Sequence, residues 1–162
     1  MNRMEFLKAS VALSAISVLP YSCLNRFHSS RFKLGYQLFS IRDEMANDPV
    51  ATLKILKKMG YQHFEHYGFK AEYGTYYGYK TSEFKNILND LNLSITSGHY
   101  PFANYFNKPL DELSKYVDQC IQGALTMKSK YIVWPWIAPE DRNIDGFKKL
   151  SKKLNLMGEQ IN

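Results

Sequence analysis

The stretch from Lys33 to Phe69 constrains the fold most, because it predicts a strand, a helix and a second strand in direct succession. Leu34 to Ile41 is short, apolar and aromatic, as a buried strand is. Asp48-Pro49 then supplies a helix N-cap and a first helical residue whose missing N–H is not needed, and Gly60 supplies the left-handed residue at the helix end. Two strands joined by one helix through short loops lie parallel in a sheet.

The rest of the chain repeats this unit. Further strands are predicted at Tyr61–Tyr67, Ser94–His99 and Tyr131–Trp136, where Pro135 removes a ladder donor and ends the last one. A helix starting at Thr81, a long helix starting at Pro109 and a third over Ile144–Ile161 follow from apolar residues three and four positions apart. The eleven residues KAEYGTYYGYK, 70–80, are predicted to form a loop rich in tyrosine.

Each predicted helix has one apolar face. The inward residues expected on the four helices are Val50, Leu53, Leu56 and Met59; Phe84, Ile87, Leu88 and Leu91; Leu110, Leu113, Val117, Cys120 or Ile121, and Ala124; and Phe147, Leu150, Leu154, Met157 and Ile161. Alternation of strands and helices predicts an α/β fold with a parallel sheet. This is either an open four-stranded sheet or the first four units of an eight-unit barrel, since a barrel needs about 250 residues.

The composition indicates one well-cored domain, since 45% of the 162 residues are hydrophobic and 22% are charged. The net charge of +6 comes from 21 Lys and Arg against 15 Asp and Glu, and many of the lysines lie on predicted helices: Lys54, Lys57, Lys58, Lys85, Lys148, Lys149, Lys152 and Lys153. Their spacing predicts a solvated outer face and no nucleic-acid footprint. Neither glycine-rich phosphate-binding pattern is present, which disfavours nucleotide binding.

The N-terminus is predicted to be a signal peptide over residues 1–23. Met1–Lys8 is a short polar start, and Ala9–Leu19 is an uncharged apolar run too short to span a bilayer comfortably. The start looks like a twin-arginine signal in which Met4 replaces the second arginine. The expected location is the bacterial periplasm, or the membrane surface if Cys23 is lipidated; an N-terminal helix retained as an anchor is the alternative. Residues 24–32 are expected to be a linker.

The two cysteines are not expected to form a disulfide bond. Only Cys23 and Cys120 are present, so removal or acylation of Cys23 leaves Cys120 without a partner. Cys120 lies on the apolar stripe of its helix and is expected to be a small core residue.

Candidate functional residues stand at the ends of the predicted strands, where parallel βα folds place their working groups. They are Gln37, Ser40 and Arg42 on the first strand, Glu65 and His66 on the second, His99 on the third, and Trp134 and Trp136 on the fourth. A carboxylate and a histidine in one mouth can bind a divalent metal or exchange a proton.

Strand alternation separates Glu65 from His66, so only one of them faces a barrel interior. We assign this position to Glu65 and expect His66 to pack between sheet and helix. A buried carboxylate needs a partner, and Arg42 or a backbone donor could serve. His63 is expected at the surface, at the start of its strand. His99 is either functional or a cap for the last backbone groups of its strand.

Aromatic residues offer a second kind of site. The loop tyrosines Tyr73, Tyr76, Tyr77 and Tyr79, together with Trp134 and Trp136, either pack as ordinary anchors or form a platform on which a sugar ring stacks. The C–H face of a sugar suits such a platform.

The order of four segments resembles the sugar phosphate isomerase/epimerase family, the xylose-isomerase-like TIM barrels, over Lys33–Asn162. The segments are LGYQLFSIRDEM, DPVATLKILKKMGYQHFEHYGF, SITSGHYPF and YIVWPW. The resemblance implies a (β/α)8 barrel with Mn²⁺, Mg²⁺ or Zn²⁺ at its C-terminal mouth. It implies proton transfer beside a sugar carbonyl, with a carboxylate removing the proton; some members dehydrate instead. It places Gln37, Glu65, His99, Trp134 and Trp136 near the substrate, and His99 as a metal-ligand candidate.

The chain departs from the family because the main metal ligands come from the fifth to eighth strands, which residues 33–162 do not include. No catalytic residue or further ligand is therefore assigned. The prediction is the N-terminal half of the barrel, inactive alone, with two exposed strand edges and half of a hydrophobic lumen. Its expected partner is a sugar or sugar derivative, and no nucleic acid.

Two other functions are compatible with these residues. One is a non-catalytic carbohydrate-binding module that closes by self-association. The other is an abasic-site nuclease, which is disfavoured because it needs more histidines than His63, His66 and His99, and because export takes the protein away from DNA.

Overall fold

The computed structural model describes residues 33–161, so the predictions for the signal peptide, Cys23 and the linker lie outside the described residues. Four parallel strands form the main sheet in the order β1–β2–β6–β7. They are β1 (Gly35–Gln37), β2 (His63–His66), β6 (Ser94–His99) and β7 (Tyr131–Val133). The α/β class and the parallel sheet are confirmed; assignment to the first half of an eight-unit barrel stays a prediction.

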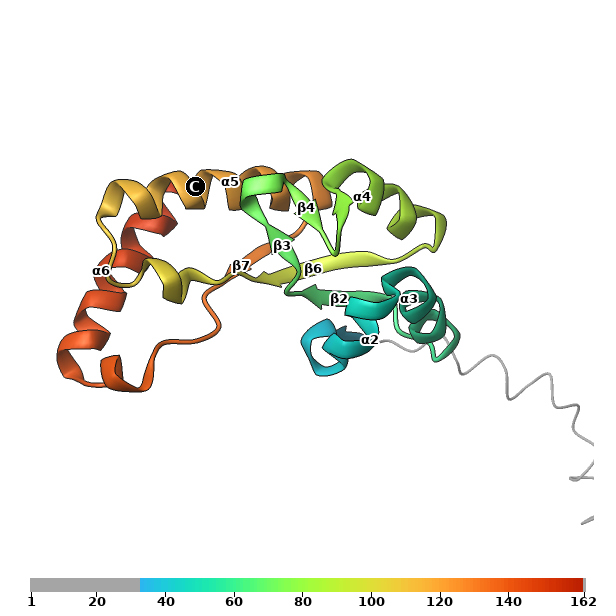
Figure 1. The fold of residues 1–162 in the computed structure, drawn as a ribbon, viewed down its shortest axis with the longest axis horizontal. Coiled ribbons are helices and arrows are strands. Elements are labelled where there is room, and N and C mark those ends of the chain that lie inside the picture. Colours follow the sequence, from blue (N-terminus) through green and yellow to red (C-terminus); the bar gives the residue numbers. More distant parts are fainter. Residues whose placement is uncertain (1–32, 162) are drawn as a thin grey trace, which may run out of the picture. The chain divides into compact units, whose positions relative to one another are not determined.

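The longer helices alternate with these strands (Figure 1). They are α3 (Pro49–Lys58), α4 (Thr81–Asp90), α5 (Leu110–Met127) and α6 (Ile144–Ile161). Figure 1 shows α4 and α5 along one side of β6 and β7. Within residues 33–161, no helix combines the length and the apolar character needed to cross a bilayer.

The first unit differs from its prediction at the strand end. β1 stops at Gln37, and the chain turns through a 3₁₀ helix (Leu38–Ile41) into α2 (Arg42–Asn47). The predicted strand over Leu34–Ile41 is therefore too long. A short apolar run is equally compatible with a strand and with a buried helical turn. Here the side chains of Leu38 and Met45 lie in the core, and both residues belong to helical turns. β2 and β7 are also shorter than predicted, and β7 ends before Pro135.

The start of α3 follows the predicted capping. Pro49 occupies the first turn, and the Asp48 Oδ1 atom accepts a hydrogen bond of 2.9 Å from the backbone N–H of Ala51. Gly60, with φ of 95°, ends the helical segment. α4 differs by one position, because Lys80 precedes the helix while its N–H donates to Glu83 Oε2 at 3.1 Å. The Thr81 hydroxyl instead donates to the Gly74 carbonyl at 2.7 Å.

Replacing Asp48 by alanine tests the α3 cap. We expect Asp48→Ala to lower the free energy of unfolding by about 1 kcal/mol, because one helical N–H loses its acceptor. Urea unfolding at neutral pH measures this difference. Asp90→Ala, at the exposed end of α4, is the matched control, and equal losses in the two variants would contradict a capping role.

Residues 69–80 form a small antiparallel sheet in place of the predicted loop. Its strands are β3 (Phe69–Lys70), β4 (Thr75–Tyr76) and β5 (Tyr79–Lys80). Positive φ angles at Gly74, Tyr77 and Gly78 permit the tight turns. The prediction of a loop was wrong because glycines that break a long strand equally allow a short hairpin.

One hydrophobic core lies between the sheet and the helices. It joins Phe64 of β2 and Ile95 of β6 with apolar residues of α3, α4 and α5: Leu53, Leu56, Phe84, Leu88, Leu113, Val117, Cys120 and Met127. Cys120 is fully buried, as predicted. Met59 and Leu110, predicted to face inward, are exposed because each lies at a helix end beyond this core.

The prediction for α6 is wrong in its details. Met157 is buried as expected, but Phe147, Leu154 and Ile161 are exposed. Lys153, predicted on a solvated face, is buried, and its Nζ donates to the Lys108 carbonyl at 3.0 Å. The buried face of the helix shares Met157 with the apolar stripe but also includes Lys153, so a lysine stem is buried while several apolar side chains of the stripe are not.

Candidate functional site

Three strands carry polar side chains in one row across the main sheet. Gln37 on β1 is the register partner of Glu65 on β2, and Glu65 is the partner of Ser97 on β6. His99 follows Ser97 by two residues and therefore shares its face. The row lies toward the carboxyl ends of the strands, where open and closed parallel sheets bind ligands.

The Glu65 carboxylate is the centre of this cluster. Its Oε1 atom accepts a hydrogen bond from Gln37 Nε2 at 2.8 Å and lies 2.8 Å from His99 Nε2. Its Oε2 atom accepts a hydrogen bond from the Ser97 hydroxyl at 2.7 Å. The side chains of His99 and Glu65 are 21% and 24% exposed, so both remain within reach of a ligand. The predicted partner, Arg42, is not used.

Gln37 also lies beside the imidazole, with 3.3 Å between its Nε2 and the Nε2 of His99. A protonated His99 Nε2 donates to Glu65, whereas an unprotonated Nε2 accepts from the Gln37 amide. The amide group has two N–H donors, so it serves both acceptors at once. The imidazole Nε2 therefore has a hydrogen-bond partner in either protonation state, Glu65 when it carries a proton and Gln37 when it does not, which suits a group that gives and takes a proton.

A β-bulge places Ser97 in the cluster. Phe64 pairs with Ile95, but the next residue, Glu65, pairs with Ser97, so β6 contains one extra residue at Thr96. The bulge changes which β6 side chains share the face of Glu65. Ser97 was not singled out from the sequence. Alternation back from His99 would have indicated it, since the two are separated by one residue.

The opposite face of the sheet holds His66, as predicted. This side chain is fully buried, and its ring packs edge-to-face against Tyr76 and Tyr100, with centroids 4.8 and 5.0 Å away. Its Nε2 lies 3.2 Å from the Tyr100 hydroxyl. Burial, and secondarily the nearby His99, lowers the pKa of His66 to about 3. His66 is therefore neutral near pH 7 and serves packing.

Three other candidate residues lie away from the Glu65 cluster. Ser40 is exposed on the 3₁₀ turn, and the Arg42 guanidinium lies over the Phe39 ring, 5.3 Å from its centroid. His63, predicted at the surface, is half-buried, with its Nδ1 2.8 Å from the Ser94 hydroxyl.

The two tryptophans lie in the segment that follows β7. The Trp134 ring stacks on Phe102 at 5.3 Å, and its Nε1 donates to the Trp136 carbonyl at 2.9 Å. Trp136 is half-exposed and lies under the Arg142 guanidinium, 5.6 Å from the ring centroid. Trp134 is thus engaged in packing, whereas Trp136 keeps an accessible ring edge.

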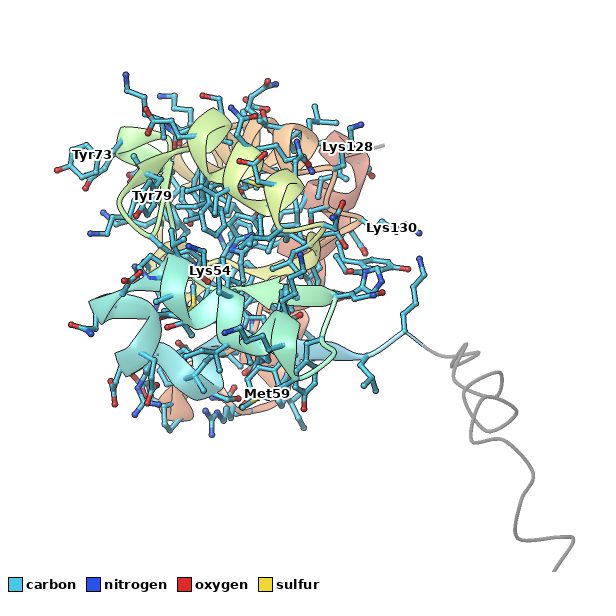
Figure 2. The ribbon with its side chains drawn as sticks, turned by 90° about the vertical axis from the view of Figure 1, so that its right-hand side faces the viewer. Lys54, Met59, Tyr73, Tyr79, Lys128 and Lys130 are labelled. Atoms are coloured by element: carbon cyan, nitrogen blue, oxygen red, sulfur yellow. The ribbon has the colours of Figure 1, made fainter. Side chains whose placement is uncertain are left out.

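The tyrosines predicted as a stacking surface divide in the same way. Tyr76 is fully buried in the core, and the Tyr77 hydroxyl accepts a hydrogen bond from the Tyr67 N–H at 3.2 Å. Tyr73 points outward from the small sheet (Figure 2). Most of this group anchors the hairpin, which favours the packing interpretation.

The cluster does not by itself fit a divalent metal. Within residues 33–161, no group of three or more histidine, cysteine, aspartate or glutamate side chains is placed to hold an ion. Glu65 and His99 supply two ligands, fewer than Zn²⁺ or Mg²⁺ takes. What these residues can do is bind hydroxyl or carbonyl oxygens and move a proton between a carboxylate and an imidazole.

The fold is similar to that of two solved structures. Two crystal structures of a sugar phosphate isomerase/epimerase from Parabacteroides distasonis are each 23% identical to this chain, with a TM-score of 0.65. The first match covers 82% of this chain and 49% of the other, and the second covers 80% and 50%. The chain therefore spans about half the length of these structures. No protein-family model and no curated protein matches the sequence.

Proposed function

We propose that the chain forms the half of an isomerase or epimerase active site that binds the sugar and transfers the proton. The observation that carries this proposal is the Glu65–His99 contact of 2.8 Å at the carboxyl end of a parallel sheet, with Gln37 and Ser97 bonded to the same carboxylate. The likeness in fold to sugar phosphate isomerase/epimerase structures supports it. The substrate class is a sugar or sugar derivative with a carbonyl group.

Each residue of the Glu65 cluster has a role in this proposal. The Glu65 carboxylate takes the proton from the carbon beside the carbonyl. His99 receives or returns a proton at Nε2, and Gln37 donates to Nε2 when the proton has left. The Ser97 hydroxyl holds the carboxylate and orients its free lone pairs toward the ligand.

A divalent metal belongs to the proposal only for a complete fold. It would polarise the carbonyl and stabilise the enediolate when bound, and its further ligands would have to come from outside residues 33–161. None of the roles above depends on the ion. We expect the 162-residue chain alone to bind sugar and to turn it over poorly.

A carboxylate-to-amide change tests the site. We expect Glu65→Gln to weaken binding of aldoses and ketoses at least about tenfold, because the amide N–H₂ faces the donors of Gln37, Ser97 and His99 and leaves polar groups unpaired. Saturation-transfer NMR on a panel of hexoses and pentoses measures the affinity. Glu44→Gln, an exposed carboxylate on α2, is the matched control and should bind like the wild type. Equal affinity in all three proteins would contradict the site assignment.

Solvent exchange separates catalysis from binding alone. Incorporation of deuterium from D₂O into the C–H beside the sugar carbonyl, lost in Glu65→Gln, would support proton transfer. Sugar binding without exchange, unaffected by a chelator, would support the second candidate, a non-catalytic carbohydrate-binding module. The half-exposed Trp136 ring, on which a sugar can stack without any chemistry, is the observation that favours that candidate.

We also propose export, because the short polar start and the apolar run before Cys23 have the pattern of a signal peptide. N-terminal sequencing of the protein recovered from a bacterial periplasm or membrane fraction tests this. A processed N-terminus near Cys23 supports export, and an intact Met1 in the cytoplasmic fraction contradicts it.

A further inference from the structure

The end of β6 that carries His99 rests on His66 from the other side of the sheet. His66 on β2 is the register partner of Gly98 on β6, and these are the two central strands of the sheet. Side chains alternate along a strand, so the His99 side chain faces Glu65. Its two neighbours, Gly98 and Tyr100, face His66. The β6 backbone therefore lies between the His66 ring and the Glu65–His99 pair.

The His66 ring contacts both residues that flank His99. A Cβ atom on Gly98 would meet this ring, with Nε2 as the nearest atom, so the ring packs directly on the β6 backbone. On the other side of His99, the Tyr100 ring packs edge-to-face on His66 with centroids 5.0 Å apart, and its hydroxyl lies 3.2 Å from His66 Nε2. Both side chains are fully buried. One ring therefore supports the backbone before and after His99.

The orientation of the His66 ring depends on one hydrogen bond. Within residues 33–161, its Nε2 is partnered by the Tyr100 hydroxyl, and its buried Nδ1 has no partner. The χ2 torsion of histidine is broad and roughly twofold, so packing alone does not select one ring orientation and the hydrogen bond does. Loss of the hydroxyl would therefore release the ring against Gly98 while the aromatic packing keeps its carbon atoms.

The sequence near His99 gives this strand end little rigidity of its own. β6 ends at His99, strand ends open more readily than strand centres, and Gly98 has no side chain to restrict its backbone. The His99 Nε2 nevertheless lies 2.8 Å from the Glu65 carboxylate, and a displacement of about 1 Å in a reacting pair can cost a factor of about a hundred in rate. We infer that His66, oriented by Tyr100, is a positioning residue that holds His99 against Glu65.

The catalytic consequence of this contact rests on the proposed function, in which Glu65 and His99 transfer a proton. The placement of His99 does not depend on that function, so it can be measured without a substrate. All the contacts involved are made by residues of the two central strands and by Tyr100, which directly follows β6.

Removing the Tyr100 hydroxyl tests the inference on the full chain. Tyr100→Phe keeps the ring packing and deletes the hydrogen bond to His66. Tyr116→Phe is the matched control, because Tyr116 is another buried core tyrosine and its hydroxyl has no hydrogen-bond partner within residues 33–161. Proton–nitrogen correlation NMR of the histidine rings reports the state of His99, and native-state hydrogen exchange reports the opening of its backbone.

We expect Tyr100→Phe to shift and broaden the His99 ring signals, because the ring then samples more than one position beside Glu65. Amide exchange at positions 99 and 100 should accelerate at least about tenfold more than exchange within α5. Tyr116→Phe should leave the His99 signals unchanged. Unchanged His99 signals in Tyr100→Phe, or exchange that accelerates equally at all protected amides, would overturn the inference, since the hydroxyl would then contribute to stability alone.

Deuterium incorporation beside the sugar carbonyl separates this inference from the proposed function. Where the wild-type protein exchanges this C–H, Tyr100→Phe should slow the exchange at saturating sugar at least about tenfold, with a smaller change in sugar affinity. Equal rates in the two proteins would overturn the catalytic role of the contact. Absence of exchange in the wild type would contradict the proposed function, whereas the His99 ring signals would still decide whether His66 positions His99.

Discussion

Gly98→Ala is expected to destabilise the protein by about 3 kcal/mol, because the position has no room for a side chain. A Cβ atom there would overlap the His66 imidazole, lying 2.5 Å from Cε1 and 2.7 Å from Cδ2. The ring cannot move away, since it is fully buried between Tyr76 and Tyr100. Thermal unfolding should show the midpoint falling by about 10 °C.

Gly158→Ala is the matched control for this substitution. Gly158 lies within α6, and an added Cβ would have no atom within 4 Å. Removing a helical glycine should therefore stabilise the protein by up to about 1 kcal/mol. Unfolding midpoints that move in the same direction for both variants would show that glycine removal, and not the overlap with His66, determines the result.

Loss of stability in mild acid is the second large effect expected. The pKa of His66 is about 3 in the folded chain, through burial and then the nearby His99, against 6.5 for an ordinary histidine. Between these values the unfolded chain binds a proton that the folded chain does not. The stabilisation is therefore complete above the unfolded pKa and decreases as the pH falls. From pH 7 to 4.5 this group alone should remove about 2 kcal/mol.

His66→Phe isolates this contribution. The phenyl ring keeps the edge-to-face packing but loses the Tyr100 hydrogen bond, so the variant should be about 1 kcal/mol less stable at pH 7. Its stability should then fall less steeply in acid, because the variant lacks the buried imidazole whose pKa is lowered in the folded chain. Urea unfolding at several pH values measures the two slopes. Parallel slopes would contradict the assignment to His66.

The face on which Glu65 lies could be predicted from the sequence, but its hydrogen-bond partners could not. The separation of Glu65 from His66 follows from strand alternation and was predictable from two adjacent residues. The partners of Glu65 were not, because Gln37 and Ser97 lie 28 and 32 residues away along the chain. Register between distant strands is set when the sheet assembles, and the bulge at Thr96 shifted it.

Sequence alone determined the elements with strong local signals. The α3 cap at Asp48-Pro49, the strand Ser94–His99 and the helix Ile144–Ile161 were all predicted at their observed positions. In each, the cause lies within a few residues: a capping carboxylate and proline for α3, a short run with alternating burial for the strand, and a repeat of apolar positions for the last helix. The same local logic predicted that Cys120 is buried.

Only the tertiary structure decided which surfaces meet. The apolar repeat on α6 is real, but the helix docks on α5 so that Lys153 is buried and Phe147 is exposed. Residues 69–80 formed a hairpin because Phe69 and Tyr76 pack together in the core, with ring centroids 4.9 Å apart. A periodic pattern indicates that a helix has an apolar face. Which element packs on that face depends on where the other elements lie, and no local interaction specifies their positions.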